Sequence, residues 1–221
     1  MNIEQARFNM IEQQIRPWDV LDTSVLDLLA VVKREDFVPA EHRSMAFVDT
    51  EVPLATSSGA TQCMLAPKVE ARLLQELDVR KHERVLEIGA GSGYMAALLA
   101  HRAQHVTSLE IDPELARFAA ANLRRAGMMN AAVIQADGAA ALPADGPFDV
   151  IVLSGSVHEV PDALFAQLKT SGRLAAIVGE QPVMRAVLIT RSTDEGLVRR
   201  VLFDTVAQRL RGFPEPTRFH F

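Results

Sequence analysis

The chain has 221 residues, of which 48% are hydrophobic and 23% charged, and its formal net charge is −5. This length suits one well-buried domain, and the acidic balance argues against a nucleic-acid partner. No apolar run is long enough to cross a bilayer, and residues 1–5 lack the basic start of a signal peptide. We therefore expect no membrane partner. A single cysteine, Cys63, cannot form an internal disulfide, so we expect a cytoplasmic protein.

The first third of the chain predicts helices and then a loop. Apolar spacing indicates an amphipathic helix over residues 3–15 and a second helix over 22–32. Residues 49–67 show little periodicity and are rich in threonine, serine and glycine, which is typical of a loop. Pro67 fits the first turn of a helix that runs to about Leu77.

From residue 84 onward, strand and helix patterns alternate. The predicted strands cover residues 84–88, 105–109, 132–135, 148–153, 173–178, 183–190 and 198–204. The predicted helices cover residues 93–101, 113–126 and 161–168. Such alternation predicts an α/β fold with a doubly wound, mostly parallel sheet and right-handed crossovers. We expect one domain, with a helical extension and substrate loop over residues 1–78 and a ligand-binding α/β core over 79–221.

A glycine loop follows the first strand of this core and leads into a helix. Its sequence is Arg84-Val85-Leu86-Glu87-Ile88-Gly89-Ala90-Gly91-Ser92-Gly93-Tyr94. A dinucleotide fingerprint would have its third glycine where Tyr94 stands, and a phosphate-binding P-loop would end in a lysine that is absent here. The acid Glu87 beside the loop suits a ligand with positive charge and no phosphate. S-adenosylmethionine (SAM), with its sulfonium and ammonium groups, is such a ligand.

Two further acids end the next two predicted strands. Glu110 lies about 20 residues after Gly89, the first glycine of the loop, where a carboxylate can accept hydrogen bonds from ribose hydroxyls. Asp137 follows the third strand and could accept from an adenine amino group. The alternative is that both are solvated loop acids, with Asp137 capping a turn. The predicted cofactor residues are Glu87, Gly89, Ala90, Gly91, Gly93, Tyr94, Glu110, Ile111, Asp137 and Gly138.

The sequence identifies no catalytic residue and no metal site. The histidines are scattered, and no cysteine or acidic cluster completes a metal-ligand set. Cys63 could be a reactive thiol, but its apolar neighbours Met64 and Leu65 favour an inert one.

Several segments resemble the protein-L-isoaspartate O-methyltransferase family. The strongest are the glycine loop just described and Gln167-Leu168-Lys169-Thr170-Ser171-Gly172-Arg173-Leu174. Narrower matches are Met10-Ile11-Glu12-Gln13-Gln14-Ile15-Arg16, Phe37-Val38-Pro39, Ala46-Phe47-Val48-Asp49 and Pro53-Leu54. The resemblance implies SAM-dependent methylation of isoaspartyl carboxylates in aged proteins or peptides, whose esters collapse to a succinimide that opens partly to normal aspartate.

The resemblance fails in part at the family's active-site loop, Gly-Gln-Thr-Ile-Ser-x-Pro. The corresponding substrate loop here is Thr61-Gln62-Cys63-Met64-Leu65, followed by Ala66 and Pro67. Gln62 and Pro67 match, but the family's threonine falls on Cys63 and its serine, held to be important at the active site, falls on Leu65.

Three other functions stay open at this point. One is a SAM-dependent methyltransferase with a different acceptor, and another is a non-catalytic SAM-binding protein of the same fold. An oxidoreductase is opposed by Tyr94 and Glu87 in the glycine loop.

Overall fold

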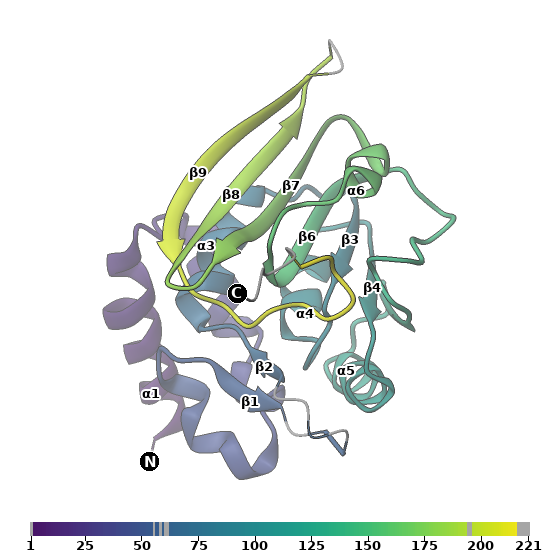
Figure 1. Cartoon of the computed structure of the whole chain (residues 1–221). Helices are drawn as coiled ribbons and strands as arrows, with labels where there is room; N and C mark the ends of the chain where they lie inside the picture. The colour runs from purple at the N-terminus through teal and green to yellow at the C-terminus, as the bar shows by residue number, and fades with distance from the viewer. Residues whose placement is uncertain (1, 55, 58, 60–61, 194–195, 216–221) are drawn as a thin grey trace, which may run out of the picture.

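The computed structural model describes residues 2–54, 56–57, 59, 62–193 and 196–215. Within these ranges the chain forms a seven-stranded sheet flanked by helices, with a two-stranded sheet below it (Figure 1). No helix in the described ranges is long and apolar enough to cross a membrane.

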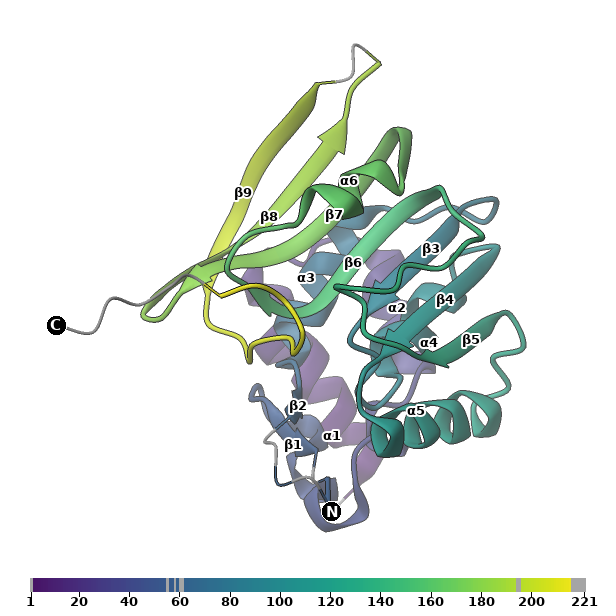
Figure 2. The same ribbon diagram turned by 45° about the vertical axis from the view of Figure 1, so that its right-hand side comes forward.

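The main sheet has the order β5-β4-β3-β6-β7-β8-β9, which places the first strand of the core near the centre. Its strands are β3 (Arg84–Ile88), β4 (His105–Glu110), β5 (Ala131–Gln135), β6 (Phe148–Val157), β7 (Leu168–Glu180), β8 (Val183–Arg191) and β9 (Leu197–Thr205). In this order, the neighbouring strands from β5 through β7 pair in parallel. The strand β8 pairs antiparallel with both β7 and β9. The predicted doubly wound, mostly parallel sheet is therefore confirmed, and Figure 2 shows its twist.

The helices also follow the predicted order. They are α1 (Ile3–Met10), α2 (Thr23–Val31), α3 (Pro67–Leu77), α4 (Tyr94–Ala100), α5 (Pro113–Arg125) and α6 (Asp162–Ala166). The helix predicted over residues 3–15 is α-helical only to Met10 and continues as a π-helical turn, Ile11–Ile15. Short 3-10 segments at Arg16–Trp18, Arg34–Asp36 and Ala40–Phe47 complete the helical extension.

One prediction for the extension was wrong. The segment predicted as a loop contains two three-residue strands, β1 (Val52–Leu54) and β2 (Gln62–Met64), which pair antiparallel. Val52, Leu54 and Met64 are buried, while Pro53 is exposed. Strands this short carry too little alternation to be recognised from sequence.

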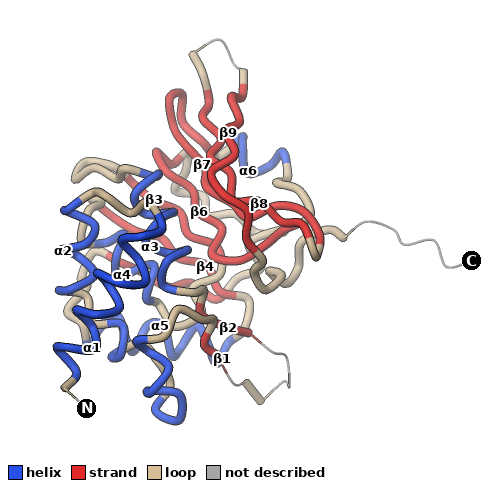
Figure 3. Tube along the Cα trace, turned by 90° about the vertical axis from the view of Figure 1, so that its left-hand side faces the viewer, coloured by secondary structure: helices blue, strands red, loops and turns tan. Residues whose placement is uncertain are grey.

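The sheet separates two hydrophobic clusters. The larger cluster joins buried residues of α1 to α5 with one face of the sheet, and the smaller one joins α6 to the other face. Figure 3 shows α1 to α4 grouped on one side of the strands. Because both faces of the parallel strands are covered, the ends of the strands are the part of the sheet left open to a ligand. In such folds, ligands bind at the carboxyl ends of the strands.

Candidate functional site

The glycine loop between β3 and α4 depends on three left-handed backbone conformations. The φ angles of Gly89, Gly91 and Gly93 are 93°, 53° and 81°. A side chain on Gly93 would lie 3.1 Å from the carbonyl oxygen of Ala119 in α5, so this glycine permits close helix packing. The loop therefore needs its glycines for backbone shape as well as for any ligand.

Glu87 in β3 is the most buried of the three predicted acids, with an exposed fraction of 0%. Its carboxylate accepts hydrogen bonds from the hydroxyls of Ser108, in β4, and Ser154, in β6 at 2.8 Å. Burial raises the pKa of Glu87 to about 7, although the two hydrogen bonds lower it. A positively charged ligand nearby would favour the ionised form of this carboxyl.

Glu110 is the last residue of β4 and supports the glycine loop directly. Its Oε2 accepts from the backbone N–H of Gly91 at 2.8 Å, and its Oε1 accepts from the backbone N–H of Asp112 at 3.0 Å. Burial raises the pKa of Glu110 in spite of these bonds. Because a carboxylate oxygen has two lone pairs, both oxygens can still accept from a ligand hydroxyl.

Asp137 follows β5 and is half-buried. Its Oδ1 accepts from the backbone N–H of Ala139 at 2.9 Å, as expected of an acid that caps a turn. The turn-capping interpretation thus has support for Asp137, and this contact leaves Oδ2 available. The neighbouring Gly138 is held close to Ile88, where a side chain would clash with it.

Two small cavities meet at the glycine loop and share Gly89. The first has a volume of about 30 Å³ and includes Glu110, Ile111 and Gly138 in its lining. The second has a volume of about 20 Å³. Its lining includes Cys63 to Leu65 of the substrate loop, Glu87, Gly89 to Ser92, and Tyr94. The structure therefore brings most of the predicted cofactor residues and most of the predicted substrate loop to one place, while Gly93 and Asp137 line neither cavity. Thr61 lies outside the described residues.

The C-terminal segment 207–213 closes the cleft, which the sequence analysis missed. The backbone of Ser156 bonds to that of Gln208 and Leu210 at 2.8 Å each. The side chain of Leu210 covers Gly89, because a Cβ added at that glycine would lie 2.6 Å from Leu210 Cδ2. Arg211 completes the cover with an ion pair to Asp112 at 3.3 Å. Leu210 and Arg211 line the first cavity but not the second. Both cavities are smaller than a ligand site of ordinary size, which is about 300 Å³ or more.

The substrate loop offers no reactive thiol. Burial, together with the nearby Glu51, raises the pKa of Cys63 to about 12, so the thiol stays protonated near neutral pH. This agrees with the inert cysteine expected from its neighbours. Leu65 is 4% exposed and lines the second cavity with an apolar side chain.

A buried polar cluster behind the substrate loop was also missed. The guanidinium of Arg34 donates to the carbonyl oxygens of Leu65 at 2.9 Å and Ala46 at 3.2 Å. Its Nε lies 3.6 Å from Oε2 of Glu70, which is too long for a hydrogen bond. A signal for this cluster does exist in the sequence, since Glu70 occupies the buried face of α3 with Leu73, Leu74 and Leu77.

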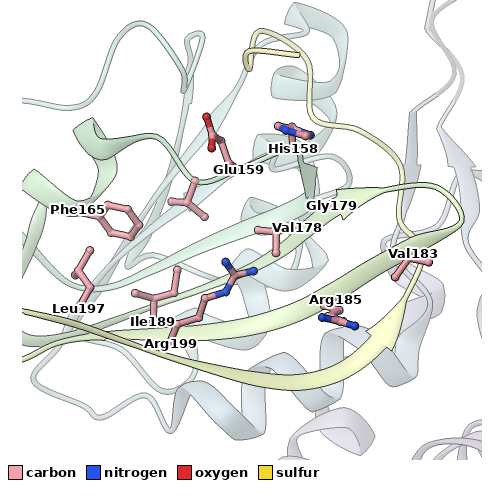
Figure 4. Close-up of a pocket in the computed structure, with 11 residues that line it drawn as sticks. His158, Glu159, Phe165, Val178, Gly179, Val183, Arg185, Ile189, Leu197 and Arg199 are labelled. Atoms are coloured by element: carbon pink, nitrogen blue, oxygen red, sulfur yellow. The ribbon is translucent and has the colours of Figure 1, made fainter. Parts of the chain in front are cut away.

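A larger cavity, of about 500 Å³, lies away from the glycine loop. It is lined by the loop after β6, by β7, β8 and β9, and by Phe165 of α6, and its lining includes Arg185 and Arg199 (Figure 4). None of the predicted site residues lines it. The described part of the chain also contains no group of three or more His, Cys, Asp and Glu side chains that could hold a metal ion.

The chain is similar to known proteins over most of its length. A family model described as protein-L-isoaspartate(D-aspartate) O-methyltransferase matches residues 5–207. A protein-L-isoaspartate O-methyltransferase of Methanoculleus marisnigri is 37% identical over 197 residues, which cover 89% of this chain and 87% of that protein. One of Rhodopseudomonas palustris is 40% identical over 196 residues, covering 88% of each.

Solved structures show the same fold. A structure titled protein-L-isoaspartate O-methyltransferase superimposes with a TM-score of 0.81 at 25% identity, covering 93% of this chain and 66% of that one. A structure from Plasmodium falciparum, described as a candidate enzyme of the same name in complex with S-adenosyl-L-homocysteine, has a TM-score of 0.73 at 23% identity. The matched region covers 93% of this chain and 98% of the Plasmodium falciparum chain.

Proposed function

Because the chain belongs to the protein-L-isoaspartate(D-aspartate) O-methyltransferase family, we infer that it uses SAM to methylate isoaspartyl carboxyl groups in damaged proteins or peptides. The observation that carries this inference is the arrangement of three acids beside the glycine loop: Glu87 in β3, Glu110 at the end of the neighbouring β4, and Asp137 just after β5. Among the described residues, no lysine or arginine lines the cavity between the glycine loop and the substrate loop, so its charge favours a cation.

The residues present fit SAM. Glu87 is a fully buried carboxyl held by two serine hydroxyls, and a nearby positive charge would stabilise its ionised form. We assign Glu87 to the cationic end of the cofactor, Glu110 to its ribose hydroxyls and Asp137 to its adenine amino group. Gly89, Ala90, Gly91, Gly93 and Tyr94 form the loop beside it, and Ile111 and Gly138 line the cavity near Glu110.

The reaction makes modest chemical demands on the protein. The cofactor supplies a methyl group on a positively charged sulfur, and an ionised acceptor carboxylate needs no general base to take it. The protein must bind the acceptor in line with that methyl group and keep water out. This explains why no catalytic dyad is required, and it gives Gln62 to Leu65 the role of receiving the acceptor.

Leu65 sets a quantitative expectation for this site. Its side chain cannot form the hydrogen bond that a serine could give to a carboxylate. Losing a bond to a charged partner costs about 1.5–3 kcal/mol, which is about ten- to a hundredfold in rate. If no other group supplies that bond, isoaspartyl methylation by this chain is correspondingly slow.

The test is methyl transfer from labelled SAM to an isoaspartyl peptide, with the matching aspartyl peptide as control. We expect label only in the isoaspartyl peptide, in a base-labile ester. Equal labelling of both peptides, or label found only on other molecules of a cell extract, would point to a different acceptor and contradict the proposal.

A further inference from the structure

The cavity between the glycine loop and the substrate loop contains an acid that the assignments above do not use. Glu70 of α3 lines this cavity together with Leu65, Glu87 and Ser154. The residue is 4% exposed, and its Oε2 has no hydrogen-bond partner in the described part of the chain. The cavity, at about 20 Å³, has room for about one water molecule.

Glu70 forms a buried ion pair with Arg34, but this contact gives its Oε2 no hydrogen bond. The Nε of Arg34 stands 3.6 Å from Oε2 of Glu70 and also lacks a hydrogen-bond partner. The two other guanidinium nitrogens are used by the carbonyl oxygens of Leu65 and Ala46. A structural ion pair at this depth would be expected to close to hydrogen-bond distance, since burial without a bond is costly.

An apolar residue would suit this position of α3 better. Leu73, Leu74 and Leu77 share the buried face of the helix with Glu70 and are each 0% exposed. Replacing a buried ionic group by a well-packed apolar one of similar size is often stabilising. A carboxyl kept here against that cost points to a role in the cavity.

The charge state of Glu70 favours hydrogen-bond donation. Burial raises its pKa to about 8, and the neighbouring Glu87 acts in the same direction, while Arg34 opposes them. The groups facing it are Arg34 from the 3-10 segment, Glu87 from β3 and Tyr94 from α4, with Cys63 of β2 nearby. Burial keeps Tyr94 and Cys63 protonated near neutral pH, so neither adds a negative charge.

We propose that Glu70, in its protonated form, donates a hydrogen bond to the acceptor carboxylate and so takes the place of the hydroxyl that Leu65 lacks. The proposal rests on the proposed function, because it names the group that holds the acceptor of that reaction. Arg34 is then a positioning residue, which fixes the Leu65 carbonyl on one side and lies beside Glu70 on the other. No proton is transferred, and Glu70 regains its initial state after each turnover.

The test compares Glu70→Leu with Glu70→Gln, since glutamine keeps a donor and leucine does not. We expect Glu70→Leu to lower kcat/KM for an isoaspartyl peptide by about ten- to a hundredfold, and Glu70→Gln to retain most of it. In calorimetry, the affinity for the peptide in the presence of S-adenosylhomocysteine should fall in Glu70→Leu. The affinity for S-adenosylhomocysteine alone should be unchanged in both variants.

The pH profile gives a readout that a merely structural role would not move. In the parent, kcat/KM should decline as pH rises through about 8, because Glu70 loses its proton, and this decline should be absent in Glu70→Gln. Glu83→Gln is the matched control, since Glu83 is a buried acid paired with Arg173 at 2.7 Å and does not line the cavity. Serine restored at the loop, as Leu65→Ser in the Glu70→Leu background, should recover activity.

The outcomes separate this proposal from the proposed function. A parent that methylates isoaspartyl peptides while Glu70→Leu does so equally well would overturn only the role of Glu70. Equal weakening of S-adenosylhomocysteine and peptide in Glu70→Leu would also overturn it, since Glu70 would then act on the cofactor. A parent that neither binds nor methylates the isoaspartyl peptide would overturn both.

Discussion

The cofactor side of the cleft and its reaction side are built in different ways. On the cofactor side, the glycine loop and the acids Glu87 and Glu110 lie at or beside the ends of neighbouring strands, in a short stretch of sequence. On the reaction side, Arg34, Leu65 and Glu70 meet from a 3-10 segment, a loop and a helix. A local motif of the first kind is readable from sequence, whereas the second kind depends on how the extension packs.

The two sides also differ in how their polar groups are satisfied. Glu87 and Glu110 each accept two hydrogen bonds from this chain. On the reaction side, Oε2 of Glu70 and Nε of Arg34 are buried without a hydrogen-bond partner in the described residues. The cofactor side is thus organised by the fold itself, and the reaction side keeps bonding capacity for an acceptor.

The largest expected effect comes from Gly91→Val, which tests whether the glycine loop is a ligand site. A valine at a φ of 53° is strained, and its side chain would approach Leu54 Cδ1. We expect calorimetry to detect no SAM binding, while circular dichroism shows a folded protein. Gly127→Val is the control, because Gly127 also has a positive φ, 73°, but nothing lies within 4 Å of an added Cβ. Intact SAM binding in Gly91→Val would make the loop a structural turn only.

The free energy of unfolding of Glu70→Leu tests the reaction side. In the folded parent, the pKa of the Glu70 carboxyl is about 8, above its ordinary value of 4.5, so the folded state binds this proton more tightly than the unfolded state. That contribution to stability is fully present below pH 4.5 and is lost as pH rises toward 8.

At pH 8, Glu70→Leu should therefore raise the free energy of unfolding by about 1–4 kcal/mol, with a smaller gain at pH 5. Urea unfolding at the two pH values measures this difference. A variant less stable than the parent at both would show that the carboxyl is needed for folding rather than kept for the acceptor.

Glu110→Ala should weaken SAM binding by about 1–3 kcal/mol, because ribose hydroxyls would be left unpaired in a buried site. Asp137→Ala should cost the same or less, since one oxygen of Asp137 also caps the turn at Ala139. Asp145→Ala is the control, as Asp145 pairs with Arg84 at 2.6 Å at the opposite end of β3. If both test variants bind SAM as tightly as the parent does, the ribose and adenine assignments are wrong.

The smallest expected effect is at Ser57, a hydroxyl that precedes the substrate loop. Its backbone N–H donates to Glu114 at 2.9 Å and its hydroxyl also contacts that carboxylate. Because Ser57 is exposed and already bonded there, Ser57→Ala should change kcat/KM by less than about twofold. A loss comparable with that of Glu70→Leu would identify Ser57 as the donor to the acceptor instead.

The sequence predicted those parts of the molecule that repeat a local pattern. The bounds of β3 and the start of α3 were predicted to the residue, and α3 ends near the predicted Leu77, since proline begins the helix and a buried apolar run forms the strand.

The missed features depend on contacts between distant segments. Leu210 lies 121 positions after Gly89 in the chain, and no pattern in the sequence around Leu210 indicates the contact between them. Arg34 could not be linked with Leu65 or Glu70 without the tertiary structure. Glu70 itself did break the apolar pattern of its helix, so a charged residue at a core position of an amphipathic helix was the one signal available.

The measurement that tests the central claim most directly is a calorimetric titration of the parent protein with SAM, S-adenosylhomocysteine and NAD. The acid-flanked glycine loop predicts that the first two bind and that NAD gives no measurable heat, since Glu87 and Glu110 would repel its phosphates. Tight NAD binding with no heat from SAM would contradict the account.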